Sequence, residues 1–180
     1  MKLLSLSKYA LILFTTLAFI QCNNDDDTPE LINEEEEINR IEIKVTGDSG
    51  SEVYTWNEGD NGLDLPLAAS GTYQVEVSFF DASDPNDVEA INPEVIEEAD
   101  EHHVLFENSS AVLAIASASN DNQDSSGNPL GLKTTWTTSD AGSAVVRLFL
   151  IHEPTTKSGQ SRDDFGGETD VQLDINVTVQ

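Results

Sequence analysis

Apolar and polar residues alternate with a period of two over most of the chain beyond residue 38. The clearest run is 72–80, and the most regular one is 171–179, near the C-terminus. Such alternation is typical of a β-strand that buries one face and exposes the other. These two runs therefore predict strands whose apolar faces pack on a common core.

Shorter runs with the same pattern are separated by turn residues. They are 41–46, 53–57, 104–106, 111–118, 134–138 and 143–151. Short alternating strands with glycine-rich turns predict a mainly β fold. We expect an antiparallel β-sandwich, immunoglobulin-like in the broad sense, over residues 38–180. The predicted core consists of Val75, Val77, Phe79, Val112, Ala114, Trp136, Val146, Leu148, Leu150, Leu173, Ile175 and Val177.

The pattern also predicts one short helix, at residues 93–101. Asn92 precedes Pro93, and these residue types favour an N-cap followed by the first helical position. Acidic residues follow, and they suit the positive end of a helix.

The N-terminus has the organisation of an export signal. Lys2 and Lys8 flank an apolar stretch, residues 9–20, that is shorter than the ~20 residues of a membrane-spanning helix. Cys22, the one cysteine of the chain, follows directly. Residues 17–22 resemble the end of a bacterial lipoprotein signal. We therefore expect cleavage after residue 21 and a lipid anchor on Cys22; the alternative is an ordinary cleaved signal with a chance cysteine.

Residues 22–37 predict an acidic, disordered tether, because they are highly charged and poor in apolar side chains. Their start, with Asp25, Asp26 and Asp27, resembles the acidic export signal of surface lipoproteins from Bacteroidetes-type bacteria. That resemblance implies the outer membrane and the cell surface.

A strongly negative charge limits the partners. The chain has a net charge of −26, and loss of Lys2 and Lys8 with the signal would leave −28. Nucleic acid is excluded as an expected partner, because binding its phosphates needs Lys and Arg. The charge fits a solvated body on a tether, or a protein that binds cations.

All three histidines have acidic neighbours, and this pattern suggests a metal site. His102 and His103 follow Glu101, and His152 precedes Glu153. Imidazole together with carboxylates binds zinc or copper. The candidate ligand set is His102, His103, His152, Glu101, Glu153 and Glu168. The alternative is that these histidines are structural and are satisfied by nearby carboxylates.

No catalytic motif is present. The G-x-S-x-G elbow of serine hydrolases is absent, and paired carboxylates carry no information in a chain with 34 acids. We therefore expect a protein that is not an enzyme.

Several segments, in order along the chain, resemble one family of small Bacteroidetes lipoproteins. They are residues 98–102, 127–132, 152–154, 166–170 and 176–180. Members are often labelled "type 1 periplasmic binding fold superfamily protein". That label implies two lobes of parallel sheet, whereas the alternation here predicts a sandwich. The genes of such lipoproteins often lie near TonB-dependent outer-membrane receptors, which implies a role beside nutrient or metal uptake.

Three functions are consistent with these features. The first is a lipid-anchored binding module of the cell envelope, accessory to outer-membrane uptake of a nutrient or metal. The second is a structural or adhesive surface lipoprotein without a small-molecule site. A small hydrolase is the third and most remote.

The lipid anchor predicts the behaviour of a Cys22→Ser variant. Without the thiol no lipid can be attached, so the protein should appear in the soluble fraction or keep its signal peptide. Fractionation with mass spectrometry of the mature protein measures this. A variant that stays in the membrane at the normal mature mass would contradict the lipoprotein interpretation.

Overall fold

A computed structural model describes residues 37–180 of the chain. The predicted signal peptide at 1–21, the predicted lipidation site Cys22 and the predicted tether up to residue 36 lie outside the described residues.

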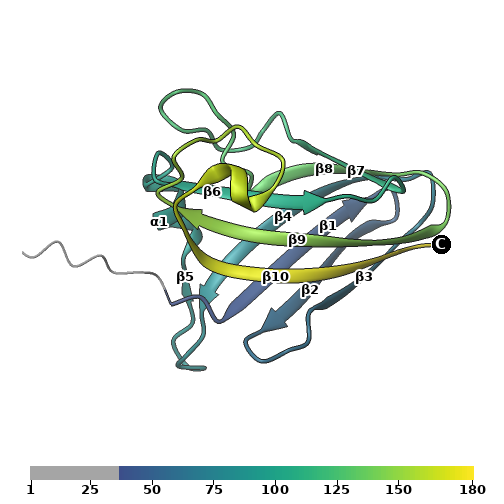
Figure 1. The fold of residues 1–180 in the computed structure, drawn as a ribbon. Helices are drawn as coiled ribbons and strands as arrows, with labels where there is room; N and C mark the ends of the chain where they lie inside the picture. The colour runs from purple at the N-terminus through teal and green to yellow at the C-terminus, as the bar shows by residue number, and fades with distance from the viewer. Residues whose placement is uncertain (1–36) are drawn as a thin grey trace, which may run out of the picture. The chain divides into compact units, whose positions relative to one another are not determined.

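Within the described part, ten strands form two sheets that pack face to face, which confirms the predicted β-sandwich (Figure 1). The first sheet has the order β2-β1-β4-β8-β7, with β5 also paired to β4. Its strands are β1 (Arg40–Gly47), β2 (Gly50–Asn57), β4 (Thr72–Asp81), β5 (Glu89–Ala90), β7 (Leu113–Ser117) and β8 (Lys133–Thr138). The second sheet has the order β3-β10-β9-β6. Its strands are β3 (Leu63–Leu67), β6 (His102–Asn108), β9 (Gly142–His152) and β10 (Glu168–Val179).

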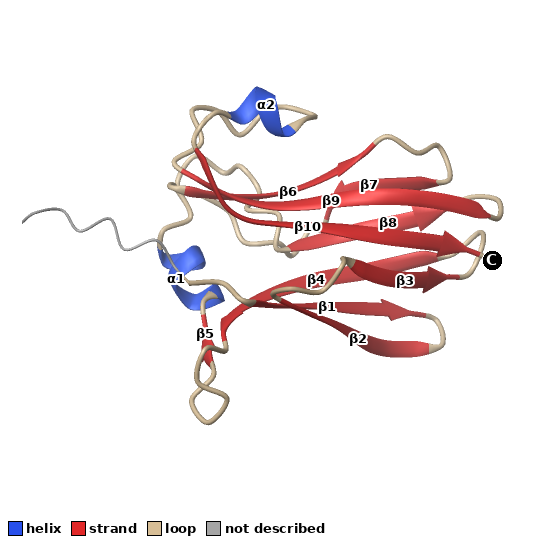
Figure 2. Ribbon diagram, turned by 60° about the horizontal axis from the view of Figure 1, so that its bottom comes forward, coloured by secondary structure: helices blue, strands red, loops and turns tan. Residues whose placement is uncertain are grey.

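The core lies between the two layers that Figure 2 shows stacked on each other. On β10 every second residue from Val171 to Val179 is buried, as the alternation predicts. The predicted core residues on β4, β8, β9 and β10 are buried as well. Burial of these apolar faces, at about 25 cal/mol per Å² removed from water, is the main stabilising term of the fold.

Three strands differ from the prediction, among them the two-residue β5, which the pattern analysis did not identify. β3, which the pattern analysis did not identify, pairs with β10 in parallel, so the second sheet is mixed. Pro66 lies within β3, and proline is tolerated there because β3 is an edge strand. On β7 the predicted face is wrong: Ala114 is exposed and Val112 is only partly buried, while Leu113 faces the core. The larger side chain of leucine buries more apolar area.

The predicted helix is shorter than the sequence indicates, and a second short helix is present. α1 (Asn92–Glu97) has Ile91 at its N-cap, with proline in its first turn. The Asn92 side chain instead accepts a hydrogen bond from Phe79 N at 2.7 Å and donates one to Val77 O at 3.0 Å, which ties the helix to β4. The second helix, α2 (Arg162–Phe165), was not predicted and begins with a capping box between Ser161 and Asp164.

Both helices lie toward the end of the sandwich that is opposite the C-terminus (Figure 1 and Figure 2). Neither has the length and apolar character required to cross a bilayer, and no other helix occurs in residues 37–180.

The core predicts the cost of a truncation on β9. Leu148 is fully buried, so Leu148→Ala should lower the free energy of unfolding by about 2–5 kcal/mol. Val145 on the same strand is 54% exposed and provides the control. Urea denaturation followed by circular dichroism measures both variants. Equal losses for Leu148→Ala and Val145→Ala would contradict the assignment of the core.

Candidate metal centre

The ends of three neighbouring strands bring two histidines together. His102 begins β6 and His152 ends β9, and the antiparallel register places the two residues directly opposite each other. On the other side of β9, Glu168 at the start of β10 is the register partner of His152. Residues that are far apart in the sequence therefore meet at one end of the second sheet.

Both histidines face the interior of the sandwich. His102 and His152 continue the core-facing rows that contain Val104 on β6 and Leu150 on β9. His102 is fully buried and His152 is 8% exposed. Their rings stack with centroids 4.9 Å apart and planes inclined by only 6°. Two buried polar side chains are therefore in contact at the end of the apolar core.

A carboxylate joins this pair because of an irregularity in β10. The register of β10 on β9 shifts between Thr169 and Val171, so Asp170 lies at a β-bulge. Such a β-bulge changes the direction of side chains near it. The Asp170 carboxylate and one ring nitrogen each from His102 and His152 all lie within 4.8 Å of one another.

The His102 ring is held in one orientation from the side of α1. Its Nδ1 lies 3.3 Å from Glu98 O and 3.9 Å from Glu98 Oε2. A carbonyl oxygen can only accept, so Nδ1 is the donor in this contact. Histidines that bind metals usually donate their second N–H to a carbonyl or carboxylate in this way.

A second acidic group reaches His152 from the surface. Glu101 and Glu153 are exposed, and each places a carboxylate oxygen within 4.8 Å of the other and of a His152 nitrogen. Glu153 has a positive φ of 47°, which is unusual for a residue other than glycine. Gly167 packs against this turn so closely that a Cβ would lie 2.2 Å from His152 O. The chain is therefore strained where β9 ends.

The structure separates the six predicted ligands into different places. His102 lies in the first cluster and Glu101 and Glu153 lie in the second, while His152 belongs to both. Glu168 is exposed and belongs to neither cluster, although it is paired with His152 in the register. Asp170 was missed, because regular alternation around Val171 predicts an outward direction for it.

His103 faces the opposite side of the sheet. Its ring stacks on Phe165 of α2 with centroids 4.9 Å apart, beside the cluster that contains Leu105, Phe149 and Ile151. It is 8% exposed, and burial, together with the charge of Lys157, lowers its pKa to about 4. His103 thus belongs to a small second core under α2.

An ion pair fixes the loops around this end of the sandwich. Lys157 Nζ lies 3.3 Å from Asp124 Oδ2, both side chains are largely buried, and Lys157 also donates to Ala99 O. Hydrogen bonds from Asn128, helped by Lys157, lower the pKa of Asp124 to about 2. The pair joins the loop after β9 to the loop before β8 and to the end of α1. Removing either partner would leave a buried charge unpaired, which is strongly destabilising.

Comparisons of the chain with protein-family models, with curated proteins and with solved structures find no match. The arguments about the site therefore depend on its geometry and chemistry alone.

The low pKa of His103 predicts a pH dependence of stability. With a pKa of about 4 in the folded state and 6.5 as its ordinary value, this residue binds more protons when the chain unfolds. Its contribution is complete above pH 6.5 and is lost as the pH falls toward 4. The loss amounts to about 3 kcal/mol, from a pKa difference of about 2.5 at about 1.4 kcal/mol each.

A His103→Phe variant tests this, since phenylalanine retains the contact with Phe165 but cannot be protonated. Denaturation of the wild type and the variant between pH 7 and 4, with a chelator present, should show a shallower decline for the variant. The lowered pKa of Asp124 acts at a more acidic pH and does not enter this interval. Identical declines would show that His103 is not the group responsible.

Proposed function

We propose that this protein is a binding module of the cell envelope that holds one transition-metal ion, zinc or copper, between His102, His152 and Asp170. The observation that carries the proposal is the convergence of these three donors, with ligand atoms within 4.8 Å of one another, at the ends of three strands. Strand pairing brings these three positions together, but it does not require that two buried histidines and a carboxylate occupy them.

The donor set selects the class of metal. Two imidazoles and one carboxylate suit zinc, copper and related transition metals, whereas calcium and magnesium prefer oxygen ligands alone. Zinc usually has four ligands, so three protein donors leave one position for water or for a ligand from outside. A module that captures a metal and passes it on needs such a position.

Binding requires a small rearrangement of the site. Donors around a tetrahedral zinc ion with bonds of 2.0–2.1 Å lie about 3.3 Å apart, and the three donor atoms here lie within 4.8 Å of one another. Stacked rings also direct their in-plane lone pairs alongside each other and not toward one point. His152 is the ring that can turn, because His102 is fully buried and held by Glu98.

The surroundings support an approach from solvent. Burial decreases from His102, through His152 and the half-buried Asp170, to the exposed Glu101 and Glu153. Exposed carboxylates next to a site raise the local concentration of cations, and a net charge of −26 adds to this effect. Glu101 and Glu153 would therefore bind the incoming ion weakly before the inner donors take it.

The cellular role in the proposal follows from the sequence features. A lipid on Cys22 would anchor the protein to the outer membrane, and the acidic segment after it would carry the folded part at the cell surface. The module would bind metal there without catalysing a reaction, as an accessory to a TonB-dependent receptor. What supports this part is the lipoprotein signal and the family resemblance of residues 98–180.

Metal titration tests the site directly. Purified full-length protein is stripped with a chelator and titrated with Zn²⁺ and with Cu²⁺ by isothermal calorimetry. One equivalent should bind, and His152→Ala or Asp170→Asn should weaken binding at least about tenfold. Binding should also raise the melting temperature of the wild type as the metal concentration increases. Protons compete for imidazole, so binding should weaken at acidic pH.

The matched controls are His103→Phe and Glu168→Gln, which change a neighbouring histidine and a neighbouring acid outside the cluster. Both should bind the metal like the wild type. Weak binding that salt abolishes and that His152→Ala leaves unchanged would identify a general effect of the acidic surface. The histidines would then be structural, and the metal-binding function would be refuted.

A further inference from the structure

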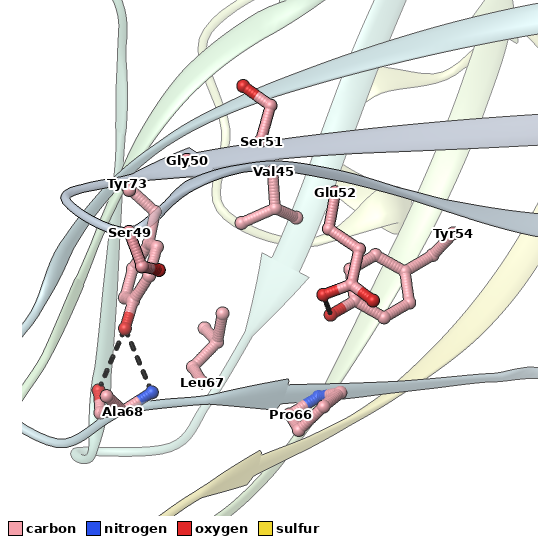
Figure 3. Close-up of a pocket in the computed structure, with 11 residues that line it drawn as sticks. Val45, Ser49, Gly50, Ser51, Glu52, Tyr54, Pro66, Leu67, Ala68 and Tyr73 are labelled. Atoms are coloured by element: carbon pink, nitrogen blue, oxygen red, sulfur yellow. Dashed lines mark hydrogen bonds between the residues drawn. The ribbon is translucent and has the colours of Figure 1, made fainter.

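A pocket opens at the other end of the sandwich, where the two sheets separate at one edge. It has a volume of about 440 Å³, and its walls are the β1–β2 turn, the inner face of β2, the end of β3 and the start of β4 (Figure 3). β2 and β3 are terminal strands of their sheets in the part of the chain that the structure describes. Small-molecule sites typically have about 300–1,000 Å³, so the size fits a ring-shaped ligand.

The ring of Tyr73 forms one wall and is fixed in place. Its hydroxyl accepts a hydrogen bond from Ala68 N at 2.9 Å and donates one to Ala68 O at 3.2 Å. The ring packs on Gly47 so closely that a Cβ there would lie 2.9 Å from it. A rigid, half-buried aromatic ring provides contact area for a ligand at little cost in conformational entropy.

Tyr54 and Glu52 form the opposite wall. They are two residues apart on β2 and therefore on the same face, and the Tyr54 hydroxyl donates to Glu52 Oε2 at 2.7 Å. Burial, with the hydrogen bond to Glu52, raises the pKa of Tyr54 to about 12, so the hydroxyl keeps its proton. The carboxylate still has acceptor sites that can take hydrogen bonds from a ligand.

The base of the pocket is apolar. Val45 and Leu67 are buried and point toward each other from opposite sides in Figure 3. The pocket thus combines two aromatic walls and an apolar base with a carboxylate at its side. β2 and β3, the terminal strands of their sheets among residues 37–180, both contribute residues to the lining.

We propose that this pocket binds a neutral carbohydrate, with one sugar ring between Tyr54 and Tyr73 and its hydroxyl groups donating to Glu52. The C–H face of a sugar packs on aromatic rings, and its hydroxyls match a carboxylate and a strand edge. This mixture of apolar contact and a few oriented polar groups is what small-molecule sites provide.

Charge disfavours an anionic ligand, and size disfavours a compact cation. Glu52 is the one residue of the Asp, Glu, Lys and Arg types in the lining, in a chain with a net charge of −26, so an anionic ligand would be repelled. A compact ammonium ion could contact Glu52 and one tyrosine ring, but it would leave most of the 440 Å³ and the other wall without a contact.

The pocket is independent of the proposed metal centre. Leu67 at the pocket pairs with Val179 at the end of β10, whereas Asp170 lies near its start. Nine residues of strand separate them, which corresponds to about 30 Å at about 3.3 Å per residue. Changes at sites this far apart are expected to act additively.

The test uses purified full-length protein and a panel of neutral sugars. The panel contains glucose, galactose, mannose, N-acetylglucosamine, maltose and cellobiose. Saturation-transfer NMR detects binding, and backbone chemical shifts locate it. We expect at least one sugar to shift the amides of residues 49–54 and 68–73. Tyr54→Ala should weaken that sugar about three- to tenfold, as expected for one aromatic contact, and Glu52→Gln should weaken it too.

Two controls make the result specific. Val53→Ala changes the opposite, exposed face of β2 and should leave sugar binding unchanged, and His152→Ala should do the same if the two sites are independent. Thermal unfolding confirms that each variant is folded. Choline, tested beside the panel, represents a compact ammonium ion. The proposal is overturned if no sugar in the panel binds, or if choline shifts these amides and no sugar does. It is also overturned if sugar binding survives both Tyr54→Ala and Glu52→Gln.

Discussion

The register of β9 between β6 and β10 is the constraint on which both the core and the candidate metal centre depend. Side chains on a strand alternate, so a slip of one residue would turn every core residue of β9 toward the other face. The same slip would move His152 away from His102. Ala144 and Val146 therefore fix the position of the site, because the opposite face of this part of β9 is exposed and turning them toward it would cost free energy.

The regular ladder stops where the candidate ligands lie. Three irregular features lie at the end of β9 and the facing start of β10. They are the bulge at Asp170, the positive φ at Glu153 and the close packing of Gly167 on His152 O. Of these, the positive φ of Glu153 is backbone strain, which costs of order 1–3 kcal/mol and persists only where the surroundings enforce it. The core rows of β9 and β10, and the ion pair between Lys157 and Asp124, supply that enforcement.

The two proposed sites use opposite ends of the same scaffold for different reasons. At the α1 end, loops and helices cover the opening and bury two histidines, which creates a site with few exposed donors. At the other end the sheet edges remain open, and aromatic side chains of β2 and β4 form the walls of a shallow pocket. The acidic surface affects the two differently, since it attracts a cation to the first and has no effect on a neutral sugar at the second.

The local pattern of apolar and polar residues predicts much of the fold of this protein. Alternation predicted the sandwich, most of its strands and the buried faces of β4, β8, β9 and β10, because burial of a strand face leaves a period of two in the sequence. It was less informative for β3, which is short and contains Pro66, and for β7, where Ala114 and Ala116 make the outward face apolar as well. The acids around His102 and His152 suggested a candidate site, and the structure places these two histidines side by side.

Which of these side chains meet was decided only by the tertiary structure. His102 and His103 are neighbours in the sequence, yet the strand sends them to opposite faces, one toward His152 and the other toward Phe165. Asp170 joins the cluster through a bulge that leaves no mark on the alternation of β10. Tyr54 and Tyr73 face one pocket because two different strands bring them there. Contacts of this kind depend on register, bulges and the pairing of distant strands, which local periodicity does not encode.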